Sequence, residues 1–126
     1  MLRIGFLLSV FLLGVCMCSN EAEKPLPYHI DYLAQPTDVQ AGIDNNGRLH
    51  VSWHMDSVAH VKHFVVGVMD STGAERTLPV LDPQATSYTD STLTILPHSI
   101  YLVRVWAVDD HNFFGPPSAP DSLIVQ

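Results

Sequence analysis

The chain has 126 residues, which is enough for one domain, and it is acidic, with 13 Asp and Glu against 6 Lys and Arg. Nucleic acids and anionic membrane surfaces both require clustered basic residues in their partners. The charge balance therefore predicts that neither is a partner of this chain.

Residues 1–18 have the three-part pattern of a secretory signal peptide. Arg3 is the only charge, an apolar run extends from Ile4 to Val15, and small and polar residues follow. The run is shorter than the roughly 20 apolar residues that a membrane-spanning helix needs. We therefore predict cleavage after Cys18, with Ser19 and Ala22 as alternative sites, and a secreted, extracellular product. Membrane association is expected only if this segment stays uncleaved.

Both cysteines, Cys16 and Cys18, lie in the segment that is removed. The remaining chain of about 108 residues is large enough to form a core without disulfides. We therefore expect the mature domain to be held together by packing alone.

Residues 19–35 contain Pro25 and Pro27 and show no sustained periodicity, so they are interpreted as a linker to a domain over residues 36–126. Within that domain, apolar and polar residues alternate in short runs separated by turn residues, which is typical of strands. Asn46-Gly47 predicts a tight hairpin with positive φ angles, and Pro79 predicts an edge strand. The expected strands cover residues 37–43, 48–55, 62–70, 76–81, 88–95, 100–108 and 121–126.

The segment from Pro36 to Gln126 resembles a fibronectin type III domain. The resemblance is carried by Pro36, Trp53, Ile95, Pro97, Tyr101 with the alternating residues after it, and the segment Gly115-Pro-Pro-Ser118 with Pro120. It implies an all-β fold, a seven-stranded immunoglobulin-like β-sandwich. It also implies that Trp53 fills the space between the sheets and that the Tyr101 hydroxyl bonds the backbone around Ile95 to Pro97. The Arg-Gly-Asp tripeptide that some relatives use for integrin binding is absent.

No catalytic or metal-binding pattern stands out. His50 and His54 share one face of a predicted strand, but their Cα atoms would lie roughly 13 Å apart, too far to share one zinc ion. Asp109-Asp110 lacks the further oxygen ligands that calcium requires. No serine lies in a nucleophile-elbow motif, and no phosphate-binding glycine loop occurs. We expect no enzyme activity, no metal and no cofactor.

Apolar residues at outward strand positions are the main candidate site. If Tyr101 and Val103 point inward, Leu102 and Trp106 point outward, beside Val65 and Met69 of the neighbouring strand, with Ile124 as a further member. An exposed apolar patch that contains Trp is typical of an interface. The alternative is that the N-terminal linker or the stem of Arg104 covers the patch, or that it is ordinary surface.

Phe113 and Phe114, in the loop 109–115, are a second candidate: one ring is expected to pack on the sandwich and the other to anchor a partner. The resulting hypothesis is a secreted protein-binding or adhesion module that recognises an extracellular protein through the outward sheet face or this loop. The alternative is a structural or antigenic surface protein that self-associates through the same face, as a homodimer.

Overall fold

The computed structural model describes residues 32–126, so the predicted signal peptide and most of the predicted linker lie outside the described residues. No helix in residues 32–126 is long and apolar enough to cross a membrane. The described chain forms the strands β1 (Thr37–Ile43), β2 (Leu49–His54), β3 (His63–Met69), β4 (Glu75–Val80), β5 (Ser87–Asp90), β6 (Ile100–Val108) and β7 (Asp121–Ile124).

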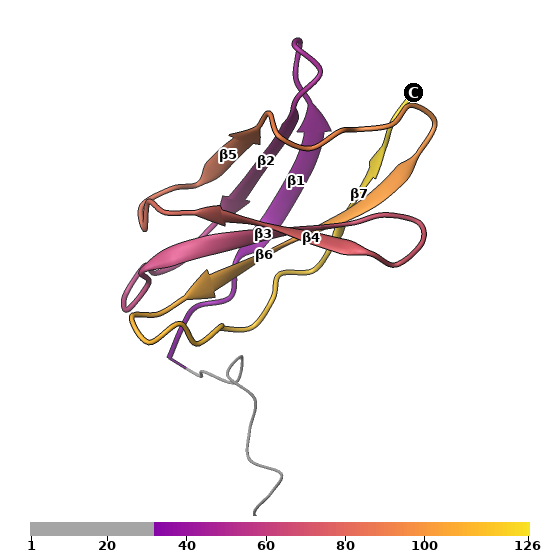
Figure 1. The fold of residues 1–126 in the computed structure, drawn as a ribbon. Coiled ribbons are helices and arrows are strands. Elements are labelled where there is room, and N and C mark those ends of the chain that lie inside the picture. Colours follow the sequence, from indigo (N-terminus) through magenta and orange to yellow (C-terminus); the bar gives the residue numbers. More distant parts are fainter. Residues whose placement is uncertain (1–31) are drawn as a thin grey trace, which may run out of the picture.

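These strands form two antiparallel sheets that pack face to face, with the order β1-β2-β5 in one and β4-β3-β6-β7 in the other (Figure 1). The expected all-β sandwich is confirmed. Alternate residues of the strands face the space between the sheets, where burial of their apolar surface stabilises the fold. The fully buried strand residues of this core are Leu49, Val51, Phe64, Val66, Val103, Val105 and Ala107.

Three connections have the same turn structure, in which the side chain of the first residue, an aspartate, accepts hydrogen bonds from backbone amides of the turn. In the turns that begin at Asp44, Asp70 and Asp109, the carboxylate accepts hydrogen bonds from the backbone amides two and four residues further on. The residue three positions on has a positive φ: Gly47, Gly73 and Asn112, at 80°, 90° and 65°. These N–H groups donate to the carbonyl of the first aspartate over 3.0 to 3.1 Å.

This turn structure corrects one detail of the sequence interpretation. The hairpin between β1 and β2 forms as expected, with Ala41 opposite Val51. However, Asn46 does not share the positive φ of Gly47, as a two-residue turn with two positive φ angles would require. The wider turn is favoured because the Asp44 side chain satisfies two backbone amides that would otherwise lack a partner.

The strand expected over residues 88–95 was predicted too long. β5 ends at Asp90, whose side chain is 2% exposed and accepts hydrogen bonds from the Thr92 and Leu93 amides. These bonds turn the chain away from β2, because an aspartate that binds amides two and three residues on competes with strand pairing. The segment that follows to β6 is therefore a loop.

Residues just ahead of Pro36, the start of the domain predicted from the sequence, also pack on the core. Leu33 is 3% exposed and belongs to the core. It packs on Gly115, where an added Cβ would lie 2.8 Å from the Leu33 side chain. Tyr32 donates a hydrogen bond of 2.5 Å to Asp109, and Gln35 donates one of 2.6 Å to the Pro117 carbonyl. Residues 32–35 thus fasten the start of the domain to the loop after β6.

Candidate functional site

The outward surface of the four-stranded sheet, here called the outer face, is defined by the register of its strands. Val65 lies opposite Trp106, Gly67 opposite Arg104, and Met69 opposite Leu102. Because successive residues of a strand point to opposite sides, these residues share the side away from the core. The structure therefore brings together the four sheet residues predicted as a patch: Val65, Met69, Leu102 and Trp106.

Half of this predicted patch is covered by the protein's own side chains, so its four sheet residues do not form one continuous exposed surface. Val65 is only 7% exposed. Trp106 lies across Gly67, where an added Cβ would come within 2.7 Å of the indole ring. The Phe114 ring packs edge-on against the indole, with centroids 6.1 Å apart. Trp106 is therefore half-buried and is held by its contacts with Gly67 and Phe114, so it contributes to the packing of the fold.

The ion pair between Arg104 and Glu75 lies beside Trp106 and also covers part of the outer face. The Arg104 guanidinium lies 4.7 Å from the centre of the Trp106 ring and pairs with the Glu75 carboxylate at 3.0 Å. A guanidinium above an indole is held by the electrons of the ring face as well as by its carboxylate partner. The arrangement neutralises both charges at the centre of the outer face.

The exposed large hydrophobic residues of the outer face lie at the end where β6 begins. Ile100, Leu102 and Ile124 are 54%, 39% and 64% exposed, and we call them the sheet-end cluster. Ile124 lies directly opposite Ile100 in the register, and Leu102 follows on the same side. Met69, which is half-buried, borders the cluster opposite Leu102. This cluster shares Leu102 and Ile124 with the patch predicted from the sequence, whereas Ile100 was not predicted.

The two phenylalanines of the loop 109–115 lie in different surroundings. Phe114 packs on Trp106 and its backbone bridges to Val108, whereas Phe113 is 43% exposed. The loop is fixed by Asp109, which is 2% exposed. Burial raises the pKa of the Asp109 carboxyl, but hydrogen bonds from Tyr32 and two backbone amides lower it by more, so the group is ionised at neutral pH. Phe113 lies beyond the end of β6, at the opposite end of that strand from the sheet-end cluster.

The residues that carry the resemblance lie where the fold needs them. Tyr101 is 7% exposed, and its hydroxyl accepts a hydrogen bond of 3.0 Å from the Leu96 amide, between Ile95 and Pro97. Trp53 is 5% exposed and packs against Phe64 with ring centroids 5.3 Å apart. Its indole N–H has no hydrogen-bond partner among the described residues. These side chains hold the sandwich together and offer no surface to a partner.

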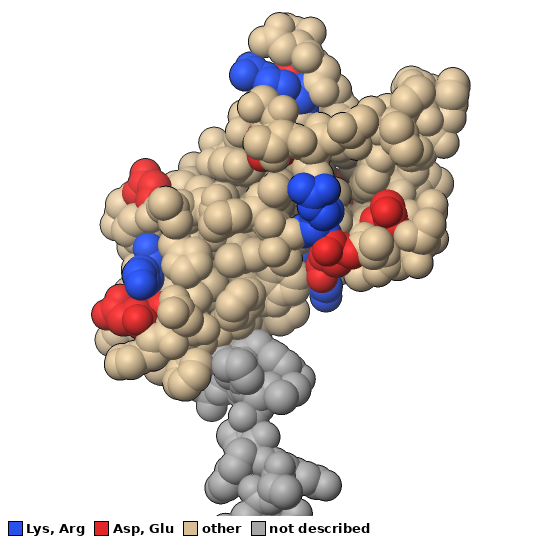
Figure 2. All heavy atoms as spheres, in the orientation of Figure 1, with Lys and Arg blue, Asp and Glu red and all other residues tan. Residues whose placement is uncertain are grey.

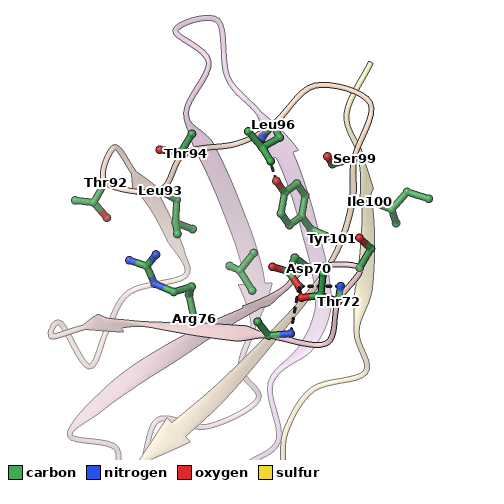
Figure 3. Close-up of a pocket in the computed structure, with 13 residues that line it drawn as sticks. Asp70, Thr72, Arg76, Thr92, Leu93, Thr94, Leu96, Ser99, Ile100 and Tyr101 are labelled. Carbon is green, nitrogen blue, oxygen red and sulfur yellow. Dashed lines mark hydrogen bonds between the residues drawn. The ribbon is translucent and has the colours of Figure 1, made fainter.

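A hollow of about 310 Å³ opens between the β3–β4 turn and the loop before β6 (Figure 3). Its lining includes Arg76 of the edge strand β4 and Thr92, Leu93 and Thr94 of the loop before β6. Arg76 lies opposite Val68 in the register, so it occupies an inward position of this edge strand. An inward charge and Pro79 on the same strand both hinder the addition of another strand. In Figure 3, Ile100 points away from the hollow, in agreement with its outward position.

The histidines among residues 32–126 do not converge on a common point. His54 lies 3.0 Å from Asp56, whereas His50 contacts the Thr89 hydroxyl. Within residues 32–126, no group of three or more His, Cys, Asp or Glu side chains is arranged to hold a metal ion. His63 is the histidine at an outward position of β3. Its pKa is lowered mainly by burial and, to a smaller extent, by the positive charge of the neighbouring Lys62. It is therefore neutral at pH 7.

Comparison with known proteins gives the fold but no family assignment by sequence. No protein-family model matches the chain, and no curated protein sequence is similar to it. Solved structures do match. The FN1–FN3 domains of chicken CNTN1 align with a TM-score of 0.63 and 24% identity over 75% of this chain and 31% of that one. This chain thus spans about a third of that structure.

Two further structures match over nearly their whole length. A Fn3-like protein from Clostridium thermocellum aligns with a TM-score of 0.55 and 22% identity, covering 72% of this chain and 91% of that one. The FN3 domain of human collagen XX aligns with a TM-score of 0.58 and 20% identity, covering 77% and 96%. The strand order and these similarities agree: residues 32–126 have the fibronectin type III fold.

Proposed function

We propose that the chain is an exported, non-enzymatic module that binds a protein through the outer face, at the sheet-end cluster. One observation carries the proposal: Ile100, Leu102 and Ile124 are neighbours on two paired strands, and all three are well exposed. Contiguous apolar surface of this kind costs solubility in a monomer and is typical of an interaction site.

The fold and the sequence support this class of function. Fibronectin type III domains are commonly used in binding or adhesion and are often extracellular, and the N-terminal 18 residues have the pattern of a signal peptide. The fold does not itself imply a partner. The location of the site therefore rests on the exposed residues.

The structure also changes which residue is the best probe of the site. Replacing Trp106 would disturb its contacts with Gly67 and Phe114, so a loss of binding would not distinguish contact from folding. Leu102 is exposed at 39% and contributes little to the core. Leu81, which is 77% exposed and lies just after β4, offers a matched control at the opposite end of the sheet from the cluster.

The test uses residues 19–126, which keep every strand and every core residue. This protein, its Leu102→Glu variant and its Leu81→Glu variant are immobilised and exposed to extracellular fluid or cell surfaces of the source. We expect a protein that is captured by the parent and by Leu81→Glu but lost with Leu102→Glu. Capture that is identical for all three proteins would contradict a binding site at the sheet-end cluster.

Export is tested separately with the full chain. We expect the protein in the culture medium of expressing eukaryotic cells, with an N-terminus at Ser19, Asn20 or Glu23 by mass spectrometry, as the cleavage sites in the sequence predict. Retention in the cell with residues 1–18 still attached would contradict export through a cleaved signal.

A further inference from the structure

The outer face differs in charge from the rest of the domain. Residues 32–126 contain ten acidic and four basic residues, a formal net charge of −6 with histidine neutral. By the register of the strands, only Glu75 and Arg104 are charged at outward positions of β4, β3, β6 and β7. These two pair with each other at 3.0 Å. The outer face is thus formally neutral.

The other charged strand residues of this sheet lie on its inner side. Asp121 pairs with the buried Val103, and its carboxylate accepts a hydrogen bond of 2.9 Å from the Ala41 amide of β1. Arg76 pairs with the buried Val68. On the side of the molecule seen in Figure 2, charged side chains form small separate groups on a largely uncharged surface.

We propose that the outer face docks a second copy of this chain, with the two sheet-end clusters in contact across a two-fold axis. This proposal rests on the proposed binding role of the cluster and names its partner. The full chain has a formal net charge of −7, so two copies repel one another and meet most favourably where neither presents net charge. A two-fold contact places the same face of both copies together, and this face is neutral and apolar at its exposed end.

Pairing through the edge of β4 is a poorer route to a dimer. Pro79 lacks an amide hydrogen there, and Arg76 occupies an inward position on the same strand. Packing face to face does not require free backbone groups. Because Trp106 lies flat across Gly67 with Phe114 and Arg104 against it, the centre of the outer face presents packed side chains to a partner.

The small area of the sheet-end cluster limits the affinity that we expect for the dimer. A stable protein interface buries about 800 Å² on each partner, and three partly exposed aliphatic side chains supply only a fraction of that. We therefore expect weak, reversible dimerisation, with a Kd of about 10 μM or higher. Salt strengthens it, because ions screen the repulsion between the copies over a Debye length of about 10 Å at 0.1 M while the neutral contact itself is unaffected.

The test is sedimentation velocity of residues 19–126 over a concentration series at low and high sodium chloride. We expect a monomer that shifts to a dimer with concentration, and a dimer fraction that rises several-fold at high salt. Monomer at all concentrations and salts overturns the second copy as partner. It leaves the capture experiment with Leu102→Glu to decide the binding role of the cluster, so the two failures are distinguishable.

Variants that place a negative or a positive charge at the same position distinguish the effect of disrupting the contact from the effect of changing the net charge. Leu102→Glu and Leu102→Lys both place a charge in the contact and are both expected to abolish the dimer, whereas Leu81→Glu and Leu81→Lys leave it unchanged. If Leu102→Lys strengthens association, reduced net charge and not this contact drives it, and the proposal fails. Ile124→Ser provides a second, uncharged disruption of the cluster. Near-UV circular dichroism and thermal unfolding are used to check that each variant is folded before its dimer fraction is measured.

Discussion

The indole ring of Trp106 lies against Gly67 of the neighbouring strand, in the space that the Cβ of any other residue would occupy. This contact decides which part of the outer face is covered and which part is free. With the ring flat on the sheet, Phe114 and Arg104 pack around it and Val65 is shielded. The sheet-end cluster, beyond the reach of the ring, stays exposed.

Gly67→Ala should destabilise the domain by roughly 1–3 kcal/mol, because the added methyl group collides with the Trp106 ring and the Glu75 carboxylate. Gly42→Ala is the matched control in a strand, since its Cβ would meet nothing within 4 Å. Its stability should be unchanged or slightly raised. Urea unfolding of both variants measures the difference. Equal, small effects at the two glycines would contradict the close packing of Trp106.

Tyr101→Phe should cost about 1–3 kcal/mol, because it leaves the Leu96 amide without its acceptor while the ring stays in place. Hydrogen exchange gives a more specific reading than unfolding alone. The Leu96 amide should exchange faster in the variant, whereas the Val105 amide, which donates to the Ser118 hydroxyl at 2.9 Å, should not change beyond the global loss of stability. An equally protected Leu96 amide would contradict the bond.

Leu33→Ala should cost about 2–5 kcal/mol, the range for truncating a leucine in a packed core. Leu81→Ala, at a site that is 77% exposed, should change the free energy of unfolding by no more than about 0.5 kcal/mol. Chemical denaturation of both variants checks the comparison. If Leu33→Ala is as mild as the control, residues 32–35 are a linker, as the sequence alone implied.

Asp90 should make unfolding sensitive to acid. Burial raises the pKa of its carboxyl, but hydrogen bonds from Leu93, Tyr88 and Thr92 lower it by more, so the folded pKa lies below the ordinary value of 3.8. A lowered folded pKa means that this group stabilises the fold above about pH 4 and that the contribution is lost as pH falls through the folded pKa.

The Asp90→Asn variant tests whether the ionised Asp90 carboxylate stabilises the fold. The variant should be less stable than the parent at pH 6, and the difference should shrink progressively as pH is lowered below about 4, where the parent carboxylate takes up its proton. Urea unfolding at a series of pH values gives the comparison. A difference that stays constant down to pH 2.5 would contradict a stabilising, ionised Asp90.

The sequence was sufficient for the strands and for the side chains that hold them. Alternation placed Leu49, Val51 and Trp53 in the core, and the resemblance to a fibronectin type III domain implied that the Tyr101 hydroxyl bonds the backbone around Ile95 to Pro97. Such features are local, because strand alternation and turn residues can be recognised within a stretch of a few residues. The same locality explains why β5 was predicted too long: its end depends on the side-chain bonds of Asp90, which Thr-rich composition does not reveal.

The errors at the candidate site arise from contacts between distant segments. Whether Val65 is exposed depends on where Trp106 and Phe114 lie, and that depends on the absence of a Cβ at Gly67. Leu33 sits among prolines with no periodicity, so nothing nearby in the sequence marks it as a core residue. Gly67, at an outward position in the middle of a strand, was the available signal, because such a glycine often marks a close approach.

The most direct test of the outer face as an interaction surface is a concentration series of amide NMR spectra on residues 19–126 at high salt. We predict progressive shifts confined to Met69, Ile100, Leu102, Ser122, Ile124 and their immediate neighbours, and their absence in Leu102→Glu. Spectra that do not change with concentration, or shifts centred on β1, β2 and β5, would contradict this account.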